Sequence, residues 1–257
     1  MDLSFEERFW EIDLLRGIAI VMMIAFHVVY DLDYFGGSLL TVHAGFWFYV
    51  ARATATIFLL LVGISLTLSF SRALRHQQSE KPLFLKYLTR GLKIFSCGLL
   101  ITVTTWVFLR EGFIVWGILH LIGIAIMLAF PLLQLRSGNL VLGIGVIALG
   151  IGVKNVTVNV PWFLWLGLTP AHFQTLDYFP LLPWFGVVLI GVFLGNSLYS
   201  NYTRHFTLGD RSDVPPVRFL EFLGRHSLFI YLIHQPVLIA VLYLSGLVNI
   251  GLISVPW

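Results

Sequence analysis

Long apolar stretches alternate with short polar or turn-rich segments along the whole chain. A helix that crosses a hydrocarbon core of about 30 Å needs about 20 predominantly apolar residues. Apolar runs bounded by charges, glycines and prolines therefore predict about seven spans. They cover roughly residues 12–34, 45–70, 91–109, 113–133, 139–153, 181–199 and 227–246. The pattern predicts an all-α fold, a polytopic transmembrane helix bundle.

The composition agrees with a membrane-embedded chain. Of its 257 residues, 58% are hydrophobic and 11% are charged, whereas soluble domains carry about 25% charged residues. Because about seven helices use up this length, we expect residues 1–257 to form a single membrane domain. The first apolar run is long and contains Arg16, so we expect it to be retained rather than cleaved as a signal peptide. We expect the net charge of +3 to reflect topology rather than nucleic-acid binding.

Basic residues gather in alternate loops, which predicts the orientation of the chain. Cytoplasmic loops are enriched in lysine and arginine. Residues 71–90 and 200–226 hold Arg72, Arg75, Lys81, Lys86, Arg90, Arg204, Arg211, Arg218 and Arg225, and the loop between them on the same side holds Arg136. The loops of the opposite side hold little beyond Arg110 and Lys154. We therefore expect a multi-pass protein of the plasma membrane, with its N-terminus in the cytoplasm and its C-terminus outside.

Two of the predicted loops have a character of their own. Residues 154–180 are rich in aromatic side chains, and this segment either caps a cavity or lies in the membrane interface. Residues 218–224, within the basic loop 200–226, place the charged Arg218 and Glu221 three residues apart among apolar side chains. That pattern predicts a short amphipathic helix at the membrane interface.

Polar residues in the first span need an explanation, because a charge inside a membrane costs about 2.5–3.5 kcal/mol on insertion scales. Arg16 and Asp13 lie near its cytoplasmic end. His27 lies eleven residues beyond Arg16, which is about 16 Å along a helix. Asp31 follows His27 at i+4 on the same helix face, where it could orient the imidazole. The residues alone allow either a ligand site or a structural histidine–aspartate pair.

Further polar residues fall in other spans. Arg52 lies inside the second span and must face the bundle interior or water, paired with an anion. Candidates for that anion are Asp31, Asp33, Asp177 and a substrate group. His120 and His234 lie in two further spans, and His43 lies in the loop before the second. Each histidine alone fits a structural role, but several on different spans, together with Arg52, favour a polar path with ligand chemistry.

Basic residues mark the cytoplasmic ends of several spans, among them Arg16, Arg90 and Lys93. Such residues act as topology signals and lipid anchors. They equally suit the phosphates of a nucleotide-like donor, since arginine offers bidentate contacts to phosphate.

Three sequence segments carry a resemblance to a known family. Residues 8–19 read Arg8-x-x-Glu11-Ile12-Asp13-Leu14-Leu15-Arg16-Gly17-Ile18-Ala19, and His27 and residues 30–36 follow. This opening resembles that of the heparan-alpha-glucosaminide N-acetyltransferase catalytic-domain family, especially its small prokaryotic members. Residues 177–186 and 224–236 are similar to its later signatures. The Asp-x-x-Arg-Gly start and His27 also resemble the acyltransferase family 3 membrane enzymes.

The resemblance implies an acyltransferase that moves an acetyl group from cytosolic acetyl-CoA across the membrane. The acceptor would be an amino or hydroxyl group of an extracytoplasmic sugar or polysaccharide. The first family implies an active histidine in the loop after the first span, where His43 is the nearest match, whereas the second implies His27. The expected supporting residues are Asp31 to orient the base, Arg52 and His120 for the oxyanion, Arg16, Arg90 and Lys93 for acetyl-CoA, and Asp33, Asp177 and His234 for the acceptor.

Two other classes of function fit the same polar residues. A proton-coupled small-molecule transporter also places Arg, His and Asp inside a membrane. A bis-histidine haem protein would draw its ligands from His27, His120 and His234. The acyltransferase is the function we expect, with the lipid bilayer, acyl-CoA and the acceptor as partners and no metal. The sequence is compatible with a homodimer.

Overall fold

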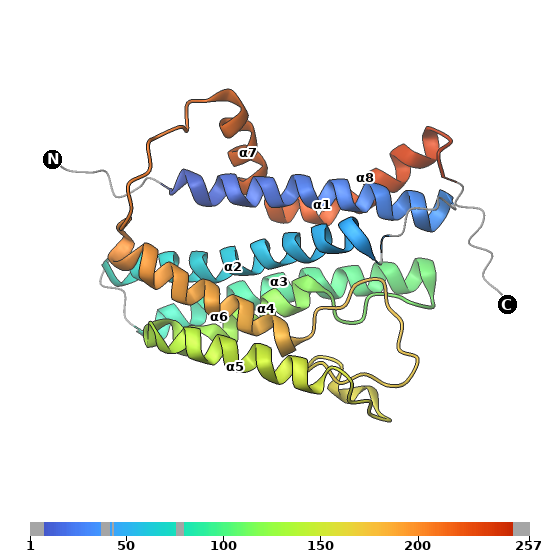
Figure 1. The fold of residues 1–257 in the computed structure, drawn as a ribbon, viewed down its shortest axis with the longest axis horizontal. Helices are drawn as coiled ribbons and strands as arrows, with labels where there is room; N and C mark the ends of the chain where they lie inside the picture. Colours follow the sequence, from blue (N-terminus) through green and yellow to red (C-terminus); the bar gives the residue numbers. More distant parts are fainter. Residues whose placement is uncertain (1–7, 37–41, 43, 76–79, 249–257) are drawn as a thin grey trace. The chain divides into compact units, whose positions relative to one another are not determined.

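The structure, a computed structural model, describes residues 8–36, 42, 44–75 and 80–248 (Figure 1). These residues form α-helices and short 3₁₀ helices, which confirms the predicted all-α class. The helices are α1 (Trp10–Gly36), α2 (Gly45–Arg75), α3 (Glu80–Leu109), α4 (Ile118–Ala129), α5 (Gly138–Val153), α6 (Leu181–Leu198), α7 (Pro215–Arg225) and α8 (Ser227–Leu244). The 3₁₀ helices are η1 (Phe130–Leu135), η2 (Pro161–Phe163) and η3 (Ser200–Tyr202).

Six helices in the described residues are long and apolar enough to cross a membrane. They are α1, α2, α3, α4 with η1, α6 and α8, and each overlaps a predicted span. The fifth predicted span coincides with α5, which has 16 residues and is about 24 Å long at 1.5 Å per residue. The protein is therefore a multi-pass membrane protein, whose described residues hold six candidate spanning helices and a shorter apolar one.

Two helices differ from the predicted boundaries. Helix α3 begins at Glu80 rather than near residue 91. The basic residues that predicted a loop before residue 91 lie in the first three turns of this helix. Helix α4 begins at Ile118 rather than near residue 113. Arg110 and Gly112 before it adopt φ values of 56° and 67°, which are incompatible with a continuing right-handed helix.

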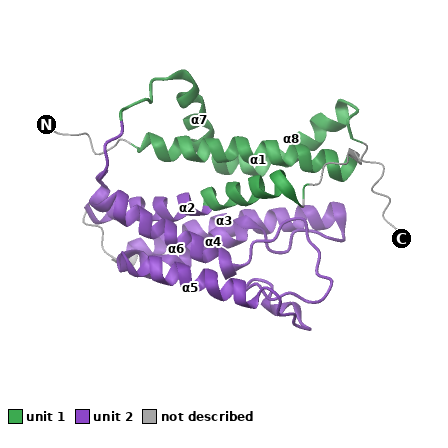
Figure 2. Ribbon diagram, viewed as in Figure 1, with its two compact units in different colours: residues 1–58, 209–257 green, residues 59–208 purple. Residues whose placement is uncertain are grey.

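The chain divides into two compact units, which Figure 2 colours separately. Unit 1 comprises residues 1–58 and 209–257, and it contains α1, α7 and α8 with the start of α2. Within it, α7 packs on α1 where two glycines allow close approach. A Cβ atom at Gly17 would fall on the carbonyl oxygen of Leu220, and one at Gly224 on that of Asp13. The predicted amphipathic helix thus exists and has a defined partner.

Unit 2 comprises residues 59–208, and its helices also approach through small residues. Gly143 of α5 and Gly186 of α6 each face the other's carbonyl oxygen, and Gly63 of α2 faces that of Val188. Thr67 donates to the carbonyl oxygen of Val192 over 3.3 Å. Close approach at small residues is the usual packing mode of membrane helices.

Candidate active site

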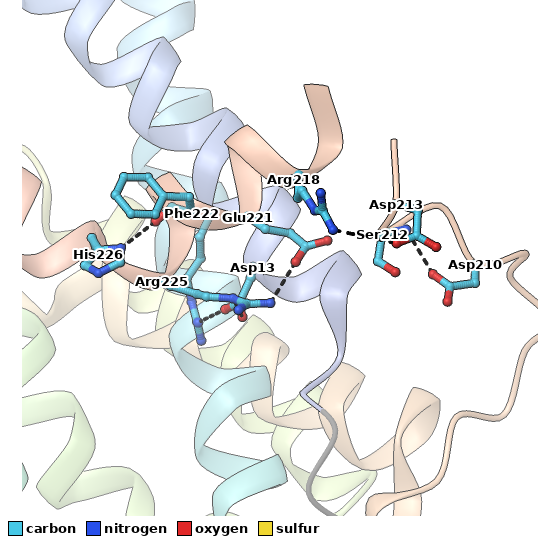
Figure 3. Close-up of polar contacts among 10 residues, drawn as sticks. Asp13, Asp210, Ser212, Asp213, Arg218, Glu221, Phe222, Arg225 and His226 are labelled. Atoms are coloured by element: carbon cyan, nitrogen blue, oxygen red, sulfur yellow. Dashed lines mark hydrogen bonds and ion pairs between the residues drawn. The ribbon is translucent and has the colours of Figure 1, made fainter. Parts of the chain in front are cut away.

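One end of α1 in unit 1 carries a cluster of acids and arginines. Arg16 donates to Asp13 over 2.8 Å, and Arg225 Nε lies 3.5 Å from the other Asp13 oxygen. Arg225 also donates to Glu221 over 2.8 Å. The acid side chains are 4% and 6% exposed, whereas Arg16 is 24% and Arg225 47% exposed. Figure 3 shows Arg225 reaching both acids. The buried acids therefore hold two arginines that still reach the surface of the unit.

Sequence analysis placed Arg16 among the acetyl-CoA contacts but missed Glu221. The spacing of Glu221 and Arg225 at i,i+4 is the signal that could have identified this pair. Their link to Asp13 depends on the close packing of α7 against α1, which apolar patterns alone do not predict. The structure therefore gives Arg16 a fixed position beside a second arginine.

Further along α1, two histidines meet in unit 1. The rings of His27 and His234 of α8 lie with their centroids 4.7 Å apart, at 80° to each other. His27 Nδ1 lies 2.9 Å from the carbonyl oxygen of Met23, and His234 Nδ1 lies 2.6 Å from that of Tyr231. Since a carbonyl oxygen can only accept, each Nδ1 carries the proton in a neutral ring. The lone pair of each imidazole is therefore on Nε2.

Asp31 belongs to the same cluster but has a different partner from the one expected. Gln235 Nε2 of α8 donates to Asp31 Oδ1. The expected contact of Asp31 with the His27 ring is not among the hydrogen bonds of the described residues, because His27 Nδ1 bonds to its own helix. Asp31 is completely buried and His234 is 8% exposed. Gln235 is thus a site residue that sequence analysis missed, although it directly follows His234.

In unit 2, His120 and Asp177 meet at the start of α4. The Gly117 amide donates to His120 Nδ1 over 3.2 Å, and the Ile118 amide donates to Asp177 over 3.1 Å. His120 Nε2 lies 3.3 Å from the Thr102 hydroxyl. These bonds satisfy amides that a helix N-terminus leaves without helical partners. Both ring nitrogens of His120 are engaged, which favours a structural role for this histidine.

The segment around Asp177 belongs to the long aromatic loop 154–180, which is tied to the start of α4. The Phe179 amide donates to the carbonyl oxygen of Trp116 over 3.0 Å. The Tyr178 hydroxyl donates to the carbonyl oxygen of Leu164 over 2.8 Å. Burial raises the pKa of Tyr178 to about 12, so its hydroxyl keeps its proton at neutral pH. Hydrogen bonds therefore fix the C-terminal end of this loop beside the start of α4.

The remaining predicted residues are not brought into these clusters by the described contacts. Arg52 in α2 is exposed, and its guanidinium lies over the Phe48 ring, 5.2 Å from the centroid. Asp33 is half-buried near the end of α1. Arg90 and Lys93 are exposed on α3 in unit 2. His43 lies outside the described residues.

Helix α1 in unit 1 has two arginines near one end, which suit an anionic group, and two imidazoles farther along, which suit proton transfer. Residues 8–236 match the family described as "Heparan-alpha-glucosaminide N-acetyltransferase, catalytic". No curated protein and no solved structure matches the chain. Because the match covers most of the sequence, the chain belongs to the heparan-alpha-glucosaminide N-acetyltransferase catalytic-domain family.

Proposed function

We propose that this membrane acetyltransferase moves an acetyl group from cytosolic acetyl-CoA to an amino or hydroxyl group of an extracytoplasmic, sugar-like acceptor. Membership of the family supports acetyl transfer with acetyl-CoA as donor. The contact of His27 with His234 is the observation that supports assigning the reaction to particular residues. A neutral histidine with a fixed Nδ1–H and a lone pair on Nε2 is suited to act as a general base.

The donor would bind with its phosphates at basic residues of the cytoplasmic side, for which we propose Arg16 of unit 1. Arg90 and Lys93 of unit 2 stay predictions from the sequence. Arg16 is held by the buried Asp13, which orients the guanidinium before the donor arrives. The distance from Arg16 to His27 is about 16 Å along the helix. The phosphates and the thioester of one extended acetyl-CoA would occupy these two positions.

The reaction would proceed by attack of the acceptor's nitrogen or oxygen on the thioester carbonyl carbon. His27 Nε2 takes the acceptor's proton as the new bond to carbon forms. The carbon–sulfur bond then breaks, the sulfur leaves with the electron pair, and the proton passes from His27 to that sulfur. Arg52 is our proposed stabiliser of the oxyanion. His43 remains the second candidate for the base, as its family position implies.

The test is CoA release by the purified protein, supplied with acetyl-CoA and glucosamine. General base catalysis typically contributes 10²–10⁴-fold, so we expect His27→Ala to lower kcat by about 10² or more. His226→Ala is the matched control, because His226 Nδ1 also bonds to the carbonyl oxygen four residues earlier but is exposed. His43→Ala, measured in parallel, decides between the two candidate bases.

Full activity in both His27→Ala and His43→Ala would rule out either histidine as the base. Glucosamine uptake into vesicles without CoA release would instead support the transporter. The wider setting that we propose is one membrane domain in the plasma membrane, with the N-terminus in the cytoplasm. The family match extends over residues of both units, which supports treating them as one domain.

A further inference from the structure

The cluster formed by His27 and Asp31 of α1 with His234 and Gln235 of α8 contains polar atoms that have no role in the proposed base catalysis. Asp31 Oδ2, His234 Nε2 and Gln235 Oε1 are buried and have no hydrogen-bond partner in the described part of the chain. A buried polar group without a partner costs about 1–3 kcal/mol. Several such atoms on adjoining side chains are expected where a ligand supplies the missing partners.

All of these atoms are hydrogen-bond acceptors. Gln235 donates through Nε2 to Asp31, so its free atom is the carbonyl oxygen. His234 donates through Nδ1 to Tyr231, so its Nε2 presents a lone pair. Asp31 adds a carboxylate oxygen. The complementary ligand therefore offers several N–H donors and a positive charge, which describes a primary ammonium group.

We propose that Asp31, Gln235 and His234 form a binding site for a protonated primary amine, the amino group of the acceptor. This inference rests on the acetyltransferase function proposed above. Asp31 provides the countercharge, and Gln235 and His234 accept the remaining N–H bonds. His27 and Gln235 are only half-buried, so parts of these two side chains reach the protein surface beside the buried acceptor atoms.

The neighbouring histidine pair fits an amine better than a hydroxyl acceptor. An ammonium group loses two protons on becoming an amide, whereas a hydroxyl loses one on becoming an ester. His234 Nε2 takes the first proton and leaves a neutral amine, whose nitrogen forms the bond to the thioester carbon. His27 Nε2 takes the second proton and delivers it to the departing sulfur. His234 then releases its proton to water, so the products are the amide, CoA thiol and one proton.

Binding measured without acetyl-CoA tests the site independently of catalysis. Isothermal titration of the purified protein compares glucosamine with glucose, which lacks the amino group. We expect glucosamine to bind about tenfold more tightly or better, since a hydrogen bond to a charged group contributes about 1.5–3 kcal/mol. Asp31→Asn should remove that difference and leave glucose binding unchanged. Asp213→Asn, at a side chain that is 98% exposed, is the control.

Equal affinity for the two sugars, or no binding of either, overturns the site even if Asp31→Asn does not fold. Unchanged glucosamine affinity in a folded Asp31→Asn protein also overturns it. Acetylation of glucosamine with an unaltered KM in Asp31→Asn would contradict the site while leaving the acetyltransferase function intact. Selective, Asp31-dependent glucosamine binding without CoA release would support the site and contradict the proposed function.

Discussion

At the scale of single residues, His120 shows how a polar side chain in a span can have a structural reason. Its Nδ1 accepts from Gly117, so its proton is on Nε2, which donates to the Thr102 hydroxyl. That hydroxyl in turn donates to the carbonyl oxygen of Ile114 over 2.7 Å. The chain of bonds connects α3 to the start of α4. We therefore expect this histidine to matter for stability.

Replacing Thr102 tests this role without removing the imidazole. Thr102→Val keeps the shape but leaves the Nε2–H of His120 without its acceptor, so we expect the free energy of unfolding to fall by about 1–3 kcal/mol. Thr104→Val is the matched control, because Thr104 is exposed and its hydroxyl donates to the carbonyl oxygen of Leu100 in its own helix. Denaturant unfolding in detergent measures both. Equal effects of the two variants would contradict the role of this bond chain.

At the same scale, the chemistry of the candidate site could be predicted only in part. His27, Asp31 and His234 stand out because polar residues in apolar runs are conspicuous. Their pairing across about 200 residues of sequence is invisible to an apolar pattern, which locates spans but does not say which spans are neighbours. Gln235 was missed because an uncharged amide near a helix proline gives no distinct signal.

At the scale of elements, apolar runs predicted where the helices lie, but charged residues did not predict where each helix begins. Apolar runs predicted every candidate spanning helix in the described residues, since burial in lipid requires such runs. The boundary predicted for α3 from charged residues was wrong, because Lys86 and Arg90 lie within the helix. A membrane helix can extend beyond the bilayer, and its charged turns then reach water.

Helix α7 gives a prediction at this scale. Gly224→Ala places a methyl group on the Asp13 carbonyl oxygen and must push α7 away from α1. Overpacking typically costs about 1–3 kcal/mol, so we expect a lower thermal midpoint. Gly145→Ala in α5 is the control, because a Cβ atom there meets nothing within 4 Å. A midpoint in Gly224→Ala as high as that in Gly145→Ala would show that α7 does not depend on this contact.

At the scale of the whole molecule, the short helix α5 decides the topology. In unit 2, residues before α4 pair with residues before α6: the Leu176 amide donates to Gly112, and the Phe179 amide to Trp116. Segments in contact must lie on the same side of the membrane. The chain between them contains α4 with η1, and α5. If α4 crosses the bilayer, α5 must cross back, although it is shorter than the hydrocarbon core of about 30 Å.

Labelling of introduced cysteines by a membrane-impermeant maleimide tests this crossing. In a Cys97→Ser background, we expect Glu111→Cys and Ala171→Cys to react in intact cells, and Ser137→Cys only after lysis. All three replaced side chains are exposed. Residue 137 lies in the turn between η1 and α5, beside Arg136, which the distribution of basic residues assigns to the cytoplasm. If Glu111→Cys and Ala171→Cys reacted from opposite sides, α5 would not cross, and the C-terminus would lie on the same side as the N-terminus.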